Sequence, residues 1–230
     1  MTWRVAVVTG GTGALGQSVV LRFLHDGATV AVPWIVPEEW ETLRSRAVDG
    51  ATRLHGARVD GTDEDAFAAF VADVLARHQR LDVLVNTVGG FAGGDLASTS
   101  LAEWRRMLDL NLTSAVIGCR AVLPAMRAAR RGRIVNVASR AVVPPVGGFI
   151  AYTVSKSAVI ALTQALAQEE RPQGIGVNAV LPSTMDTPAN RRAMPDVDRS
   201  GWVGTDAVAD VIAYLSSDGA AAVSGACVAV

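Results

Sequence analysis

Tyr152 and Lys156 stand four residues apart in the segment Tyr152-Thr153-Val154-Ser155-Lys156, at the start of a predicted helix. Side chains at this spacing lie on the same face of a helix, one turn apart. A phenol with an ordinary pKa near 10 is a poor acid–base catalyst at neutral pH, whereas an adjacent ammonium favours the phenolate and lowers that pKa. The pair therefore predicts proton exchange with a substrate.

Ser139 follows a predicted strand over residues 133–138, which places its hydroxyl where open α/β sheets bind ligands. Composition adds an independent indication for Lys156, because it is the only lysine among 21 basic residues. A site that keeps an ammonium in an arginine-rich chain needs a compact cation that a planar guanidinium does not replace. We expect Ser139, Tyr152 and Lys156 to form one catalytic group.

A glycine-rich turn, Thr9-Gly10-Gly11-Thr12-Gly13-Ala14-Leu15-Gly16, joins the first predicted strand to the first predicted helix. Glycines let the backbone approach a pyrophosphate, and the helix N-terminus offers free N–H donors. Such glycines also close turns for structural reasons alone. The position between a strand and a helix favours dinucleotide binding.

The end of the second predicted strand normally separates NAD from NADP, by an acid or by an arginine. Trp34 stands there, and no arginine follows before Arg44. We expect Trp34 to pack on the adenine side of the cofactor or to cover the core. The cofactor is thus NAD(H) or NADP(H), with the preference left open.

Short Val-rich runs alternate along the whole chain with segments whose apolar residues recur at the period of a helix. This alternation predicts a parallel sheet covered by helices on both faces. Residues 101–131 are expected to form two helical segments joined near residues 110–112. The expected fold is α/β, a single doubly wound Rossmann-type domain over residues 1–230. The expected strands are residues 4–9, 28–32, 53–59, 82–85, 133–138, 175–181 and 226–230, and the other expected helices are residues 13–26, 38–48, 64–78, 150–170 and 205–216.

Composition narrows the function classes. The 230 residues are 50% hydrophobic and carry a net charge of −1, which gives no indication of nucleic-acid or membrane binding. Apolar runs stay short of a membrane span, and the first residues lack a signal-peptide cleavage pattern. The two cysteines and three histidines fit no metal-site spacing. We expect a cytoplasmic protein without a metal.

These motifs resemble the short-chain dehydrogenase/reductase family along essentially the whole sequence. Two departures from the family pattern are Ala14, where a middle glycine is usual, and Ser183, where glycine usually follows the proline. The motifs that carry the resemblance are Thr9–Gly16, Asp60, the run Asn86-Thr87-Val88-Gly89, Asn111, Ser139, Tyr152 with Lys156, and Asn178 followed by Pro182 and Thr187.

The resemblance implies roles for individual residues. Tyr152 would be the general acid–base, Lys156 its pKa modulator and a ribose ligand, Ser139 the group that orients the substrate oxygen. Asn111 would hold a proton-relay water. The implied cofactor-binding residues are Thr9, Gly10, Thr12, Gly13, Leu15, Gly16, Trp34, Asp60, Asn86, Val88, Gly89, Tyr152, Lys156, Pro182, Thr184 and Thr187.

Residues 89–94 and 181–195, with Trp202, are similar to the dihydropteridine reductase branch, although that branch typically lacks the Ser139 and Asn111 equivalents. Three functions follow. The first is hydride transfer between nicotinamide and a small carbonyl or alcohol. The second is reduction of a quinonoid C=N, and the third is cofactor binding without catalysis. The resemblance also implies a homodimer or homotetramer, and we expect the loop 183–201 to close over the substrate.

Overall fold

The computed structural model describes residues 4–230, and its centre is one sheet of seven parallel strands. The order across the sheet is β3-β2-β1-β4-β5-β6-β7. Val-rich strands buried on both faces suit the middle of such a sheet. In chain order the strands are β1 (Val5–Thr9), β2 (Thr29–Trp34), β3 (Leu54–Arg58), β4 (Val83–Asn86), β5 (Gly132–Val137), β6 (Ile175–Leu181) and β7 (Cys227–Ala229).

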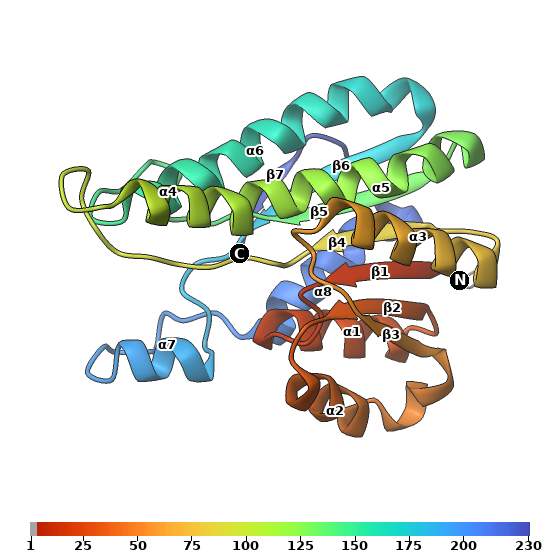
Figure 1. The fold of residues 1–230 in the computed structure, drawn as a ribbon, viewed down its shortest axis with the longest axis horizontal. Coiled ribbons are helices and arrows are strands. Elements are labelled where there is room, and N and C mark those ends of the chain that lie inside the picture. The colour runs from red at the N-terminus through yellow and green to blue at the C-terminus, as the bar shows by residue number, and fades with distance from the viewer. Residues whose placement is uncertain (1–3) are drawn as a thin grey trace.

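Helices connect consecutive strands and cover both faces of the sheet. Figure 1 shows α3, α4, α5 and α6 on one side, and α1, α2 and α8 on the other. The helices are α1 (Ala14–His25), α2 (Pro37–Arg46), α3 (Glu64–His78), α4 (Leu101–Leu108), α5 (Ser114–Ala129), α6 (Ile150–Glu170), α7 (Pro188–Ala193) and α8 (Thr205–Leu215).

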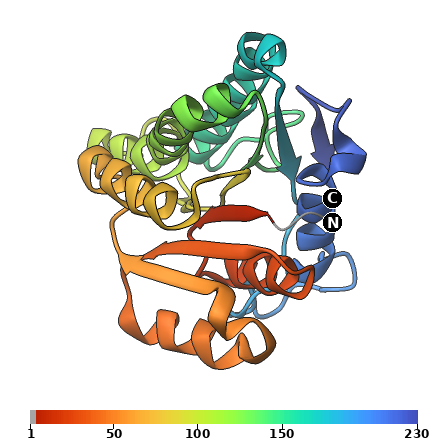
Figure 2. The ribbon, with the colours of Figure 1, turned by 90° about the vertical axis from the view of Figure 1, so that its right-hand side faces the viewer.

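Two apolar clusters, one on each face, hold the layers together. Helices α1 and α8 contribute Val19 and Ile212, both fully buried, to the first cluster. Helices α3 and α5 contribute Phe67 and Met126 to the second. Figure 2 shows this layering along the sheet.

The strand order across the sheet reverses between β1 and β4. Open α/β sheets bind ligands at such a reversal, beyond the carboxyl ends of the strands.

The expected elements are present with small shifts at their ends, and the doubly wound fold is confirmed. The expected junction within residues 101–131 is a π-helical turn, Asp109–Thr113, between α4 and α5. One α-helix of the described residues was missed. Residues 183–201 contain α7, whose start is capped by the Thr187 hydroxyl accepting from the Asn190 amide at 3.2 Å.

Two expectations concern metals and membranes. Within residues 4–230 no group of three potential metal ligands occurs. The same part of the chain holds one helical stretch, Ile150–Gln173, that is long and apolar enough to cross a membrane. Its inner face packs on the sheet, where Val159 and Ala167 are almost fully buried. Packing in the core accounts for this apolar composition.

Candidate active site

Helix α6 begins beside the carboxyl end of β5 and brings Tyr152 and Lys156 to it. The Lys156 ammonium is buried, with 6% of the residue exposed, and donates to the Val137 carbonyl oxygen at 2.8 Å. Burial lowers the pKa of Lys156 to about 8, because a charged ammonium loses its hydration there. The expected pair on one face of a helix is therefore present, and its cation is held at the end of β5.

Ser139 comes from the segment after β5, is buried, and accepts at its Oγ from the Ala141 amide at 3.2 Å. Burial raises the pKa of the Tyr152 phenol, and the hydrogen bond with Ser139 offsets part of that increase. We expected Lys156 to lower this pKa. The structure differs, since burial outweighs the other effects and the ammonium is engaged by Val137.

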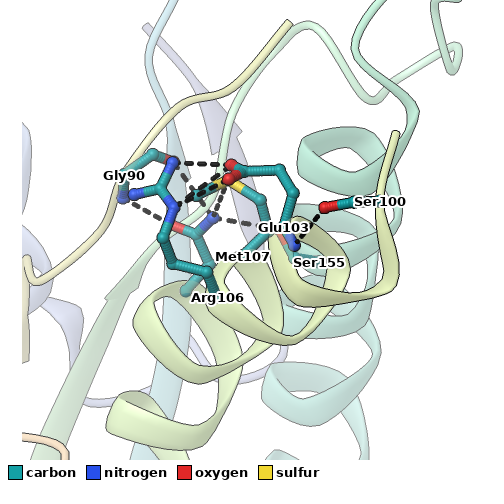
Figure 3. A network of polar contacts seen from close by, with 7 residues as sticks. Gly90, Ser100, Glu103, Arg106, Met107 and Ser155 are labelled. Atoms are coloured by element: carbon teal, nitrogen blue, oxygen red, sulfur yellow. Dashed lines mark hydrogen bonds and ion pairs between the residues drawn. The ribbon is translucent and has the colours of Figure 1, made fainter. Parts of the chain in front are cut away.

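Asn111 lies in the π-helical turn and fastens the loop after β4 to α6. Its Oδ1 accepts from the Gly90 amide at 3.0 Å, and its Nδ2 donates to the Gly90 carbonyl and to Ser155 Oγ, each at 3.0 Å. Figure 3 shows Gly90 and Ser155 within this network, beside Arg106 and Met107 of α4. A Cβ on Gly89 would lie 2.7 Å from Asn111 Oδ1 and 3.1 Å from Lys156 Nζ. Asn111 and Lys156 are thus neighbours, as expected.

The glycine-rich turn packs against Thr87 and Val88, which follow β4, and leads into α1. Gly10 has a φ of +63°, which favours glycine, and a Cβ there would lie 2.9 Å from the Val88 amide nitrogen. A Cβ on Gly16 would lie 2.1 Å from the Gly10 carbonyl oxygen. Gly13 precedes α1 without a side-chain cap, so the first N–H groups of the helix stay available. This cradle fits a pyrophosphate.

The adenosine side of this cradle is formed by β2, β3 and α2. Trp34 stacks on Trp40 with ring centroids 5.9 Å apart, and Asp60 Oδ1 accepts from the Thr62 amide at 2.9 Å. Thr12 Oγ1 donates to Glu39 Oε2 at 2.9 Å. Glu39 was missed from the sequence, because nothing in its spacing marks it as a neighbour of the turn, and Trp40 was missed as the stacking partner of Trp34.

Asn86 turns away from the crevice. It is 4% exposed, and its Nδ2 donates to Asn136 Oδ1 at 2.9 Å, while Asn136 Nδ2 donates to Thr163 Oγ1 at 2.9 Å. This buried network ties β4 and β5 to α6. The Asn86 side chain is therefore structural, and only the Asn86 backbone is left to meet a ligand.

The segment after β6 crosses the same crevice. Pro182 accepts from the Arg140 amide, and Thr184 accepts from the Val203 amide, both at 3.0 Å through their carbonyl oxygens. Thr187 is buried at the start of α7. Arg191 is paired with Asp186 at 2.5 Å, so this guanidinium is already neutralised. Of the predicted cofactor residues, Pro182 thus contacts the residue after Ser139, whereas Thr184 pairs with Val203 and Thr187 caps α7.

An aromatic cluster borders the Tyr152 phenol. The rings of Phe91 and Phe149 have centroids 5.0 Å and 6.1 Å from that of Tyr152, and Phe91 is 61% exposed. Phe91 belongs to the run 89–94 that the sequence singled out, whereas Phe149 was missed. The available signal was its place three residues before Tyr152, close to one helical turn.

Comparison with known proteins identifies the family to which this chain is similar. The family model described as short chain dehydrogenase matches residues 4–198. The chain is 34% identical to 3-alpha-(or 20-beta)-hydroxysteroid dehydrogenase of Mycobacterium tuberculosis, covering 97% of this chain and 86% of that protein.

Two solved structures share the fold. One is actinorhodin polyketide ketoreductase with NADPH, with a TM-score of 0.92, 31% identity and coverage of 99% of this chain and 95% of that one. The other is NAD⁺-bound xylitol dehydrogenase, with a TM-score of 0.91, 25% identity and coverage of 99% and 97%.

These findings confirm the expected oxidoreductase class and the expected nicotinamide cofactor, NAD(H) or NADP(H), without choosing between the two. The roles of the individual residues, the single domain 1–230 and the likeness to dihydropteridine reductases stay predictions. Motifs, fold and matches agree that this chain belongs to the short-chain dehydrogenase/reductase family.

Proposed function

We propose that this chain transfers hydride reversibly between a nicotinamide dinucleotide and a small carbonyl or alcohol, with Tyr152 as the general acid–base. The observation that carries the proposal is the buried Lys156 ammonium, held by the Val137 carbonyl at the end of β5 one helical turn from Tyr152, with Ser139 two residues farther along the chain from Val137. The catalytically silent alternative has less support, because the whole group Asn111, Ser139, Tyr152 and Lys156 is assembled.

The nicotinamide supplies or accepts the hydride, and the protein supplies position and proton transfer. In reduction, Tyr152 Oη gives its proton to the substrate oxygen, and in oxidation it takes that proton back. The Ser139 hydroxyl donates a hydrogen bond to the same oxygen, and this bond strengthens as negative charge develops. Lys156 contributes positive charge one helical turn from the phenol. Asn111 holds the Gly89–Gly90 backbone beside Lys156.

The remaining residues divide along the dinucleotide. Thr9, Gly10, Thr12, Gly13, Leu15 and Gly16 would face the pyrophosphate at the start of α1. Trp34 and Asp60 would lie at the adenosine end. The nicotinamide half would meet the backbone of Asn86, Val88 and Gly89, the side chains of Tyr152 and Lys156, and the segment with Pro182, Thr184 and Thr187.

The substrate side is apolar. Phe91 and Phe149 flank Tyr152, and Phe91 exposes most of its ring. Aromatic side chains bury large apolar area when a ligand covers them. This surface suits an uncharged substrate with an apolar body. The name of the hydroxysteroid dehydrogenase relative agrees with such a substrate.

The test is a panel of a ketone, a quinone and an imine, each offered with NADH and with NADPH while the cofactor absorbance is followed. Turnover of the ketone by the wild-type protein supports the proposal. Turnover of the imine alone would favour the quinonoid C=N alternative. Cofactor binding without turnover of any member would favour the silent alternative.

Two further predictions accompany this function. A homodimer or homotetramer is expected, with the helices that carry Asn111 and Tyr152 packed across two-fold axes, and sedimentation of the purified protein tests it. The segment 183–201 is expected to close over the substrate, so a protease should cut it more slowly when cofactor is bound. A cytoplasmic location also stays a prediction.

A further inference from the structure

The end of β2 carries no charge that chooses between the two nicotinamide dinucleotides. A Cβ on Gly11 would lie 2.8 Å from Val32 Cγ1, so the glycine-rich turn packs directly on β2. With the pyrophosphate at the start of α1, the adenosine ribose falls between this turn and the end of β2. The acid expected there is replaced by Trp34.

Trp34 and Trp40 together fix helix α2 against the sheet. Their rings are stacked, with an interplanar angle of 8°. A Cβ on Gly56 of β3 would lie 2.4 Å from the Trp40 ring, so this ring lies flat on the glycine. The stack therefore sets where the first turn of α2 stands relative to the glycine-rich turn.

The first turn of α2 brings a carboxylate to the glycine-rich turn. Glu39 Oε2 accepts from Thr12 Oγ1 at 2.9 Å, and Thr12 is a member of the glycine-rich turn. Among residues 4–230, Glu39 takes part in no ion pair. Its second oxygen, Oε1, stays free to accept a further hydrogen bond. Glu38 precedes it in the same turn, and its side chain makes no hydrogen bond to the glycine-rich turn.

Two arginines approach from neighbouring elements. Arg58 is the partner of Trp34 in the β2–β3 register and is exposed. Arg46, at the end of α2, donates to Gln17 Oε1 at 2.5 Å, and Gln17 Nε2 donates to the Thr12 carbonyl at 2.8 Å. Neither is paired with Glu39, whose carboxylate contacts the turn directly.

We propose that Glu39 makes this enzyme selective for NAD(H) over NADP(H), in place of the missing acid at the end of β2. The inference rests on the proposed function. A carboxylate accepts a hydrogen bond from a ribose 2′-hydroxyl, whereas a 2′-phosphate at the same place meets like charge. The preference should be at least about tenfold, because the negative charges of the 2′-phosphate and the Glu39 carboxylate repel each other even near the protein surface.

The test is direct binding of NADH and NADPH to the full chain without substrate, by calorimetry and by the shift in melting temperature. Wild-type protein should bind NADH at least about tenfold more tightly. Glu39→Gln keeps the hydrogen-bonding shape and loses the charge, so the ratio should fall toward one, mainly because NADPH binds better. Glu39→Asp keeps the charge and should keep most of the discrimination.

Glu38→Gln is the matched control, because it removes the same charge from the same turn without touching Thr12. Its ratio should stay close to that of the wild type. Tighter binding of NADPH to the wild type, or an unchanged ratio in Glu39→Gln, would overturn the assignment to Glu39. Failure of both dinucleotides to bind would instead remove the proposed function itself.

Discussion

Lys156 and Val137 are joined by a 2.8 Å hydrogen bond from a buried ammonium to the last carbonyl of β5. Burial sets the pKa of this ammonium at about 8, against 10.5 when it is unperturbed. The charge therefore opposes folding below pH 8. Between about pH 8 and 10.5 the unfolded chain holds more protons than the folded chain, so the free energy of unfolding rises with pH.

Lys156→Met should abolish this rise. We expect the stability of the wild type relative to the variant to increase from pH 8 to 10.5, by on the order of 1 kcal/mol or more. Urea denaturation of both proteins at pH 7 and pH 10 measures the difference. No other lysine contributes, since Lys156 is the only one in the chain. A difference that is the same at both values would show that the ammonium is not held in this environment.

Tyr152→Phe should remove the acid–base and keep the ring. We expect a loss of about 100- to 10,000-fold in kcat, with dinucleotide binding nearly intact. The chain offers a matched control in Tyr214→Phe, since Tyr214 is the only other tyrosine and is 55% exposed on α8. That variant should turn over like the wild type. Full activity in Tyr152→Phe would exclude the phenol from catalysis.

The two directions of the reaction should respond differently to pH. Burial raises the pKa of the Tyr152 phenol above its ordinary value near 10, so the neutral acid prevails at pH 7. Oxidation of an alcohol needs the phenolate, and kcat/KM for oxidation should rise from pH 7 to pH 10. Carbonyl reduction needs the phenol and should not rise over this range. An oxidation rate that is flat across the range contradicts the assignment.

Gly16→Ala should destroy the dinucleotide cradle. The new Cβ would lie 2.1 Å from the Gly10 carbonyl oxygen and 2.7 Å from Gly11 Cα, so the turn must open. We expect NADH and NADPH to raise the melting temperature of the wild type and to leave that of the variant unchanged. Gly201→Ala, where a Cβ meets nothing within 4 Å, should behave as the wild type. A normal response in Gly16→Ala would place the cofactor elsewhere.

Local chemistry alone was enough to predict the sheet, the glycine-rich turn and the neighbouring positions of Tyr152 and Lys156. Buried parallel strands leave Val-rich runs, and a phosphate cradle leaves glycines between a strand and a helix. Tyr152 and Lys156 share a helix, so their spacing alone places them on one face. Helix α7 was not predictable in the same way, because its six residues are too few for an apolar period and none of them is buried.

The sequence by itself determined the family, the fold and the placing of Tyr152 and Lys156 on one face of a helix, because each of these depends on residues close together in the chain. Only the tertiary structure decided where Lys156 directs its ammonium, that Phe149 joins Phe91 at Tyr152, and that Glu39 reaches Thr12. Thr12 and Glu39 are 27 positions apart, and their contact depends on how α2 stacks over β2 and β3. Packing between elements that are distant in the chain sets such contacts, so the spacing of residues in the sequence does not predict them.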